Sequence, residues 1–191
     1  MPSPTEQSLS SFLDEVASER VAPAGGTAIA ATGAMGAALC EMVCIHTLAA
    51  RDAGADTSSL PALRSDLERQ RRSLLALAAQ DAAVVDELFG GDGEGPSERL
   101  SKRAVGIPLA VAESCLRVLE VAERVTELGS GGVVADARIG ASLAAAALQA
   151  ALWMVRGNLD ALSAPSFAAD IADRADAIER AAADVADPFD T

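Results

Sequence analysis

The chain has 191 residues, a net charge of −13 and a composition that is 50% hydrophobic but only 3% aromatic. This length predicts a single domain over residues 1–191, and the acidic balance excludes nucleic acid as the main partner, because phosphate binding needs a basic footprint. The Ala- and Gly-rich stretch at 21–40 is too weakly hydrophobic to span a membrane, and no charged segment precedes an apolar one at the start. We therefore expect a soluble, cytoplasmic protein.

Two compositional details carry further expectations. Lys102 is the only lysine among 15 basic residues, and this scarcity with strong acidity favours a halophilic host. The alternative is an ordinary acidic protein from a GC-rich genome. The cysteines are Cys40, Cys44 and Cys115, and with His46 as the one histidine they predict buried small side chains and no metal site.

Six helices are predicted in chain order, and no strand or βαβ alternation is evident. Amphipathic spacing and Gly- or Pro-rich breaks place the helices at about residues 7–20, 27–51, 60–88, 97–128, 134–160 and 165–186. Pro108 is expected to kink or restart the fourth helix, and Gly129 to follow its end as a C′ residue. The fold class is therefore all-α, an antiparallel bundle of five to six helices with short loops at 21–26, 52–59, 89–96 and 129–132.

Polar side chains occupy positions where the helical pattern calls for apolar ones. Gln70 and Asp81 lie on the apolar seam of the helix at 60–88, and Glu41 lies in a helix that is apolar nearly all round. Burying a carboxylate costs free energy unless the group is paired or solvated. Each of these residues is therefore either functional or at a position where its side chain reaches solvent. For Asp81 the structural alternatives are a solvated helix end or a salt bridge, and for Glu41 a narrow exposed strip. The seam consists of Leu63, Leu67, Gln70, Leu74, Leu77, Asp81, Val84 and Leu88.

Two helix starts carry groups that suit a ligand. The Gly25-Gly26-Thr27 turn leads into the second helix, where free backbone N–H groups form a site for an anion or a polar ligand. Asp136 opens the fifth helix, where a carboxylate complements the helix dipole and capping is the simpler explanation.

Three stretches, in this order and spacing, resemble the formiminotetrahydrofolate cyclodeaminase / methenyltetrahydrofolate cyclohydrolase family over about residues 8–160. The opening is the most specific, with Phe-Leu-x-x-Val-Ala, then Pro-x-Gly-Gly-Thr and a helix of small residues. The stretches are 12–18 with 23–30, 33–39, 41–43 and 47; then 107–113; and finally 134–137 with 144–148, 155 and 158–159.

The resemblance implies an all-helical fold, assembled as dimers or larger, that binds folate at helix interfaces and acts on one-carbon units between N5 and N10 of tetrahydrofolate. It matches Gly25, Gly26 and Thr27 to the Gly-rich turn of the substrate site. It matches Glu41, Asp81 and Asp136 to acidic positions of the family.

The chemistry implied by the resemblance needs a carboxylate but no metal and no cofactor beyond the tetrahydrofolate substrate. We take Asp136 as the general acid/base, with Asp81 or Glu41 as the second acidic group. Lys102 and Arg103, or the cluster Arg64, Arg69, Arg71 and Arg72, could hold the substrate's glutamate tail, and ordinary surface charge is the alternative for both sets.

The leading functional hypothesis is hydrolysis of 5,10-methenyltetrahydrofolate to 10-formyltetrahydrofolate by a homodimer. The alternative reaction is that of a formiminotetrahydrofolate cyclodeaminase, which releases ammonia. An alternative of another class is a non-catalytic helical scaffold, motivated by Ala24 and Ala135 at positions where the family usually has Gly and Ser.

Overall fold

The computed structural model describes residues 7–50, 57–89, 96–129 and 131–185. Throughout this described part the ordered elements are helical and no strand occurs, which confirms the all-α prediction. Short 3₁₀ turns at Gly131–Val133 and Leu159–Ala161 flank the fifth helix. The α-helices are α1 (Leu9–Val16), α2 (Gly25–Ala50), α3 (Leu60–Phe89), α4 (Glu98–Leu128), α5 (Val134–Asn158) and α6 (Pro165–Asp184).

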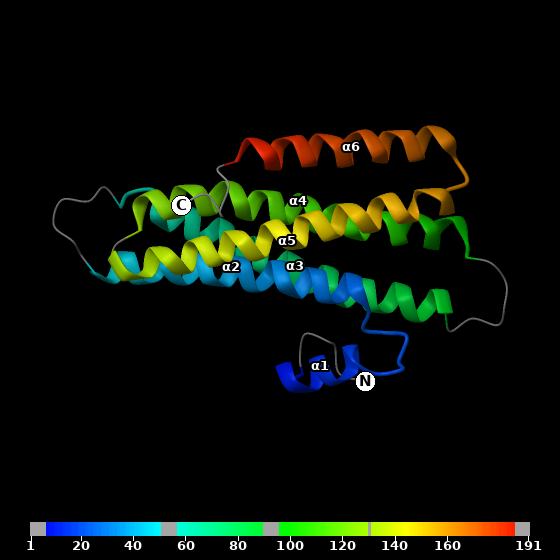
Figure 1. Ribbon diagram of the computed structural model, residues 1–191, viewed down its shortest axis with the longest axis horizontal. Helices are drawn as coiled ribbons and strands as arrows, with labels where there is room; N and C mark the ends of the chain where they lie inside the picture. Colours follow the sequence, from blue (N-terminus) through cyan, green and yellow to red (C-terminus); the bar gives the residue numbers. More distant parts are fainter. Residues whose placement is uncertain (1–6, 51–56, 90–95, 130, 186–191) are drawn as a thin grey trace.

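The four long helices α2 to α5 form the body of the molecule (Figure 1). Helix α2 packs against α3 and α5, and α4 packs against the same two helices from the other side. Consecutive helices are antiparallel, as the short connections require. Helix α6 covers α4 and α5, whereas α1 stands apart from the bundle beside the beginning of α2 (Figure 1).

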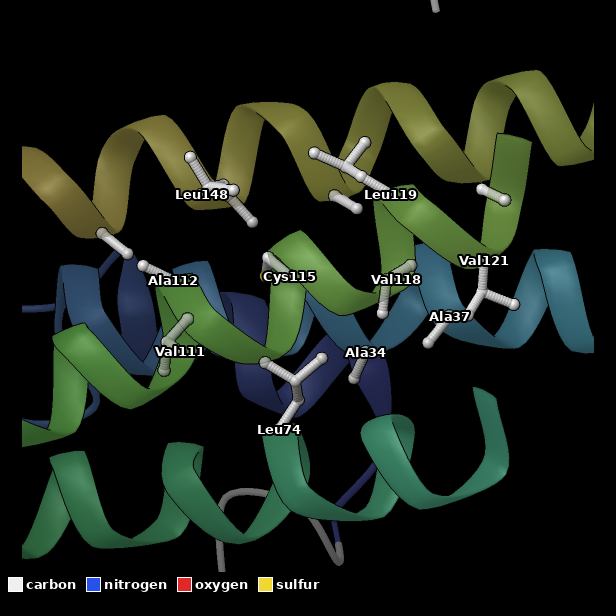
Figure 2. Close-up of a cluster of buried hydrophobic side chains, with 14 of the residues drawn as sticks. Ala34, Ala37, Leu74, Val111, Ala112, Cys115, Val118, Leu119, Val121 and Leu148 are labelled. Atoms are coloured by element: carbon white, nitrogen blue, oxygen red, sulfur yellow. The ribbon is translucent and has the colours of Figure 1, made fainter. Parts of the chain in front are cut away.

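The core is built from small and β-branched side chains rather than aromatic ones. Figure 2 shows Leu74 of α3 and Leu148 of α5 on either side of a layer of alanine and valine side chains from α2 and α4. Small side chains let α2 and α5 approach so closely that a Cβ added to Gly36 would lie 2.6 Å from the carbonyl oxygen of Gly140. The alanine-rich composition therefore serves close helix packing.

An ion pair between a buried carboxylate and a half-exposed arginine connects α3 to α4. The Asp66 carboxylate is 7% exposed and accepts hydrogen bonds from Nε of Arg117 at 2.7 Å and Nη2 of Arg69 at 2.6 Å. Gln70, the first polar residue of the predicted seam, donates to the same carboxylate at 3.2 Å. Gln70 is thus explained as part of this cluster.

Several predicted helix boundaries are corrected. Helix α1 ends at Val16 rather than near residue 20, because the backbone N–H and the hydroxyl of Ser18 both donate to the Glu15 carbonyl. Helix α2 begins at Gly25 rather than Thr27. Helix α4 runs through Pro108 without a restart. Gly129 is the C-cap with an extended backbone rather than a C′ residue, and among the described glycines the positive φ occurs at Gly131. Most of the predicted loops at 52–59 and 89–96 lies outside the described residues.

Two helical segments, Gly25–Ala50 and Gly131–Ala161, are long and apolar enough to cross a membrane by length and composition alone. The expectation that the Ala- and Gly-rich stretch at 21–40 is too weakly hydrophobic was therefore wrong on composition, because it overlaps the first of these segments. The second segment was not anticipated, although residues 139–155 carry no charge. In each segment 44% of the apolar window is buried inside the bundle, and core helices of soluble proteins meet the same criterion.

Candidate functional site

The first turn of α2 meets a carboxylate from α3. Asp81 is only 5% exposed, and its Oδ2 accepts a 2.8 Å hydrogen bond from the hydroxyl of Thr27, which is fully buried. The backbone N–H of Thr27 donates to the same carboxylate. Gly26 is required beside this pair, because a Cβ at that position would overlap the Asp81 carboxylate. The glycine and the threonine of the turn therefore form a cradle for one buried acid.

The electrostatic environment of Asp81 suits a proton-exchanging group. Burial raises the pKa of the Asp81 carboxyl, and the two hydrogen bonds from Thr27 only partly oppose that effect. Within the described residues no cation pairs with it, so both structural alternatives for Asp81, a solvated helix end and a salt bridge, were wrong. A buried carboxyl whose partner is a neutral hydroxyl can gain and lose a proton without breaking an ion pair.

A cavity of about 390 Å³ lies between α1, α2 and α3, within the range of small-molecule sites. Thr27 lines one end of the cavity, next to Asp81, and Arg71 lines the other. The apolar face of α1 forms the outer wall, although Leu9 and Leu13 are 63% and 54% exposed. The rest of the lining is mainly apolar and includes Phe12, Met35, Leu75 and Ala78, with Gln7 and Thr32 as further polar side chains.

Glu41 is buried rather than on an exposed strip, which corrects that expectation. Its Oε2 accepts a 2.9 Å hydrogen bond from Nε of Arg71, so the pair joins α2 to α3. Glu41 follows Thr27 by 14 residues, about 21 Å along the axis of α2. Glu41 and Asp81 are therefore too far apart to act on one small reacting centre.

Asp136 lies at the opposite end of the molecule from Asp81. It occupies the first turn of α5, half-buried, next to Ala137, whose carbonyl oxygen is 3.6 Å from the Cys40 sulfur. Cys40 follows Thr27 by 13 residues, about 20 Å along α2. Asp136 and Asp81 therefore do not meet within one chain, and Asp136 lines neither of the two cavities described here.

Lys102 and Arg103 line a second, more open cavity of about 640 Å³ between α3 and α4. Each already has an acidic partner: Lys102 pairs with Glu98 at 2.6 Å and Arg103 with Glu87 at 3.0 Å. This cavity shares no lining residue with the one that Thr27 and Arg71 line. The predicted tail-binding pair and the predicted Gly-rich turn thus belong to different sites. Gly25 is exposed, with open space around it.

The three cysteines are buried, as predicted, and burial raises the pKa of Cys40 and Cys115 to about 12 and that of Cys44 to about 11. Among the described residues no group of three His, Cys, Asp or Glu side chains could hold a metal ion. Sequence reasoning did not single out Arg71 as a cavity residue, because four arginines share its stretch of helix. The wall formed by α1 was missed as well.

Three comparisons place the chain among known proteins. Residues 8–177 match the family model described as formiminotransferase-cyclodeaminase. A methenyltetrahydrofolate cyclohydrolase from Methylorubrum extorquens is 33% identical over 174 residues, which cover 85% of this chain and 84% of that protein. The crystal structure of a formiminotetrahydrofolate cyclodeaminase from Thermotoga maritima superposes with a TM-score of 0.86 at 24% identity, and the match covers 93% of this chain and 91% of that one.

Proposed function

The chain belongs to the formiminotransferase-cyclodeaminase family, and from this membership we propose that it hydrolyses 5,10-methenyltetrahydrofolate to 10-formyltetrahydrofolate. The observation that carries the proposal is the 33% identity to a methenyltetrahydrofolate cyclohydrolase over most of both chains. The likeness to the solved cyclodeaminase, at 24% identity, supports the fold alone. The reaction uses water and the tetrahydrofolate substrate, and the proposal includes no further cofactor.

The cavity between α1, α2 and α3 is the proposed folate site. Its volume and its mainly apolar lining suit a flat aromatic ring system, and the few polar side chains that line it can fix the ligand's orientation. These polar side chains are Gln7, Thr27, Thr32 and Arg71. Asp81 lies directly behind Thr27 at one end. The one-carbon bridge is therefore placed beside Thr27, with the benzoyl ring extending towards Arg71 and the pterin ring on the other side of the bridge.

The Asp81–Thr27 pair supplies the acid/base step. The bridging carbon of the substrate is an amidinium-like cation, which a nearby carboxylate stabilises electrostatically. Thr27 is fully buried in the free chain, so substrate binding must open its hydroxyl to the cavity. Water then attacks this carbon; as the water oxygen bonds to it, one water proton passes to Thr27 Oγ1 while the Thr27 hydroxyl proton passes to Asp81 Oδ2. The C–N5 bond then breaks, N5 takes up the proton from Asp81 by the reverse path, and the carbinol proton is released as the formyl C=O forms.

The experiment follows the near-UV absorbance of 5,10-methenyltetrahydrofolate with and without protein, in low and in molar salt. The expected result is protein-dependent loss of absorbance above the spontaneous opening seen in buffer. Loss only in molar salt would support the halophilic host as well. If the absorbance decays at the buffer rate while the protein releases ammonia from 5-formiminotetrahydrofolate, the cyclodeaminase reaction replaces this proposal. If the protein turns over neither substrate, the non-catalytic helical scaffold is favoured.

We also propose that two copies of the chain associate through the outer face of α5. An uncharged stripe runs along this helix at alternating steps of four and three, and Ile139 and Trp153 on it are 51% and 66% exposed. Two chains of net charge −13 repel one another, and a charge-free face is where they can touch without like charges in direct contact. A two-fold pair buries such a stripe against itself. The stripe consists of Ile139, Leu143, Ala146, Ala150, Trp153 and Gly157.

Placing a charge on this stripe is expected to separate the copies. In Trp153→Glu each copy would bury a carboxylate in an apolar interface, so sedimentation should shift from dimer to monomer at micromolar concentration. Ala177→Glu, at an exposed position of α6, is the matched control and should sediment like the wild type. A wild-type chain that sediments as a monomer, or a Trp153→Glu chain that stays dimeric, would contradict this interface.

A further inference from the structure

At the end of the α1–α2–α3 cavity away from Thr27, Arg71 has hydrogen-bond donors that make no hydrogen bond within the described residues. Arg71 lines the cavity, and within the described residues its Nε donates a 2.9 Å hydrogen bond to Oε2 of Glu41. The two Nη nitrogens have no hydrogen-bond partner in that part of the chain. The arginine side chain is 31% exposed and lines the cavity, so a ligand in the cavity can contact it.

Glu41 fixes the orientation of this donor group. Its side chain is 12% exposed and belongs to the long, rigid helix α2, so the carboxylate holds the guanidinium by one edge. The remaining edge of a guanidinium is a planar fork that matches a carboxylate with two parallel hydrogen bonds. The arrangement is therefore organised for a ligand carboxylate before the ligand arrives.

The neighbouring arginines do not offer the same group. Arg69 pairs with Asp66 at 2.6 Å and Arg72 pairs with Glu68 at 2.6 Å, and neither lines the cavity. Arg71 is thus distinguished within its cluster by position and by its unused donors. Lys102 and Arg103 line the other cavity and are each paired with a glutamate.

We propose that Arg71 binds the glutamate carboxylate of the folate substrate and that Glu41 is its positioning residue. The inference rests on the proposed function and specifies one subsite of the same cavity. Arg71 and Asp81 are ten residues apart on α3, about 15 Å along the helix. A para-aminobenzoyl group along Leu75 and Ala78 connects a one-carbon bridge near Thr27 to a carboxylate at Arg71.

The test compares two substrates that differ only in the glutamate: 5,10-methenyltetrahydrofolate and the corresponding 5,10-methenyltetrahydropteroate. Arg71→Met alone would leave the buried Glu41 carboxylate without its ion-pair partner, which destabilises the fold. The main variant is therefore the double substitution Glu41→Gln with Arg71→Met, which removes both charges. The expected result is a KM for the glutamate-bearing substrate raised about 10- to 100-fold with little change in kcat, as for loss of a charge-assisted bidentate contact. The KM for the pteroate substrate should not change.

Two further variants define the roles. Glu41→Gln alone keeps an oxygen that can accept from Arg71 Nε, so its KM should rise only a few-fold. Arg72→Met, at the adjacent exposed arginine, should match the wild type on both substrates. Circular dichroism on each variant confirms that the helices are intact.

The outcomes separate this inference from the function on which it rests. If the wild type turns over the folate but the double variant keeps the wild-type KM, Arg71 is not the carboxylate subsite. A raised KM in Lys102→Met with Arg103→Met instead would overturn the assignment and move the tail to the α3–α4 cavity. If the wild type neither turns over the substrate nor binds 5-formyltetrahydrofolate in calorimetry, the proposed function itself fails.

Discussion

Replacing Asp81 with asparagine is expected to lower kcat for methenyltetrahydrofolate hydrolysis by at least about 100-fold, the usual contribution of a positioned acid/base group. Asparagine keeps the shape of the side chain and can still accept the hydrogen bonds from Thr27, but it cannot take up a proton. The KM should change much less, because the carboxylate lies behind Thr27 rather than along the apolar walls. Steady-state kinetics on the purified variant measures both constants.

Asp81→Asn should not lower the free energy of unfolding at neutral pH. The pKa of Asp81 is raised in the folded state, so the folded chain binds more protons than the unfolded chain between the two pKa values. Stability contributed by the protonated form is therefore lost as pH rises through that window, and above it the ionised Asp81 opposes folding. Asp81→Asn should unfold at an equal or higher urea concentration than wild type at pH 7. A variant that is much less stable would mean that Asp81 serves mainly to hold α2 on α3.

The second large effect is expected at the crossing of α2 and α5. In Gly36→Val the new Cβ would lie 2.6 Å from the Gly140 carbonyl oxygen and 3.2 Å from the backbone nitrogen of Ala144. Both contacts are with backbone atoms, which cannot move aside as a flexible side chain would. We expect the free energy of unfolding to fall by about 3 kcal/mol, the upper range for overpacking. Urea titration at fixed protein concentration measures the change.

Gly106→Ala is the matched control for this prediction. Gly106 is also inside a long helix, α4, but an added Cβ there meets nothing within 4 Å. Alanine should therefore raise the free energy of unfolding by about 0.5–1 kcal/mol through helix propensity alone. If Gly36→Val unfolds at the wild-type urea concentration, the close approach of α2 and α5 is not a determinant of stability.

The sequence predicted the helices well because their signals are local. The seam of α3 repeats at helical spacing, and its expected range of 60–88 differs from the structure by one residue. The ends of α1 and α2 were misplaced, because each depends on a contact that the pattern does not display. Ser18 ends α1, and the Asp81 carboxylate accepts from the first turn of α2 across 54 residues of chain.

The candidate site was predictable only in part, because spacing along one helix says nothing about which residues of another helix lie opposite. The buried position of Asp81 on an apolar seam was visible, and the Gly26-Thr27 turn was recognised separately. Their meeting was not predicted. Glu41, Asp81 and Asp136 were grouped by resemblance, whereas the antiparallel packing places Asp136 and Asp81 about 20 Å apart along α2.

The most direct test of this account compares the two aspartates in one assay. The rate of methenyltetrahydrofolate hydrolysis is measured for wild type, Asp81→Asn and Asp136→Asn at equal concentration of folded protein. Asp81→Asn is expected to lose at least about 100-fold in kcat, while Asp136→Asn is expected to keep a rate close to wild type. A chain that survives Asp81→Asn but loses its activity with Asp136→Asn would contradict the placement of the reaction at the Thr27 end of the cavity.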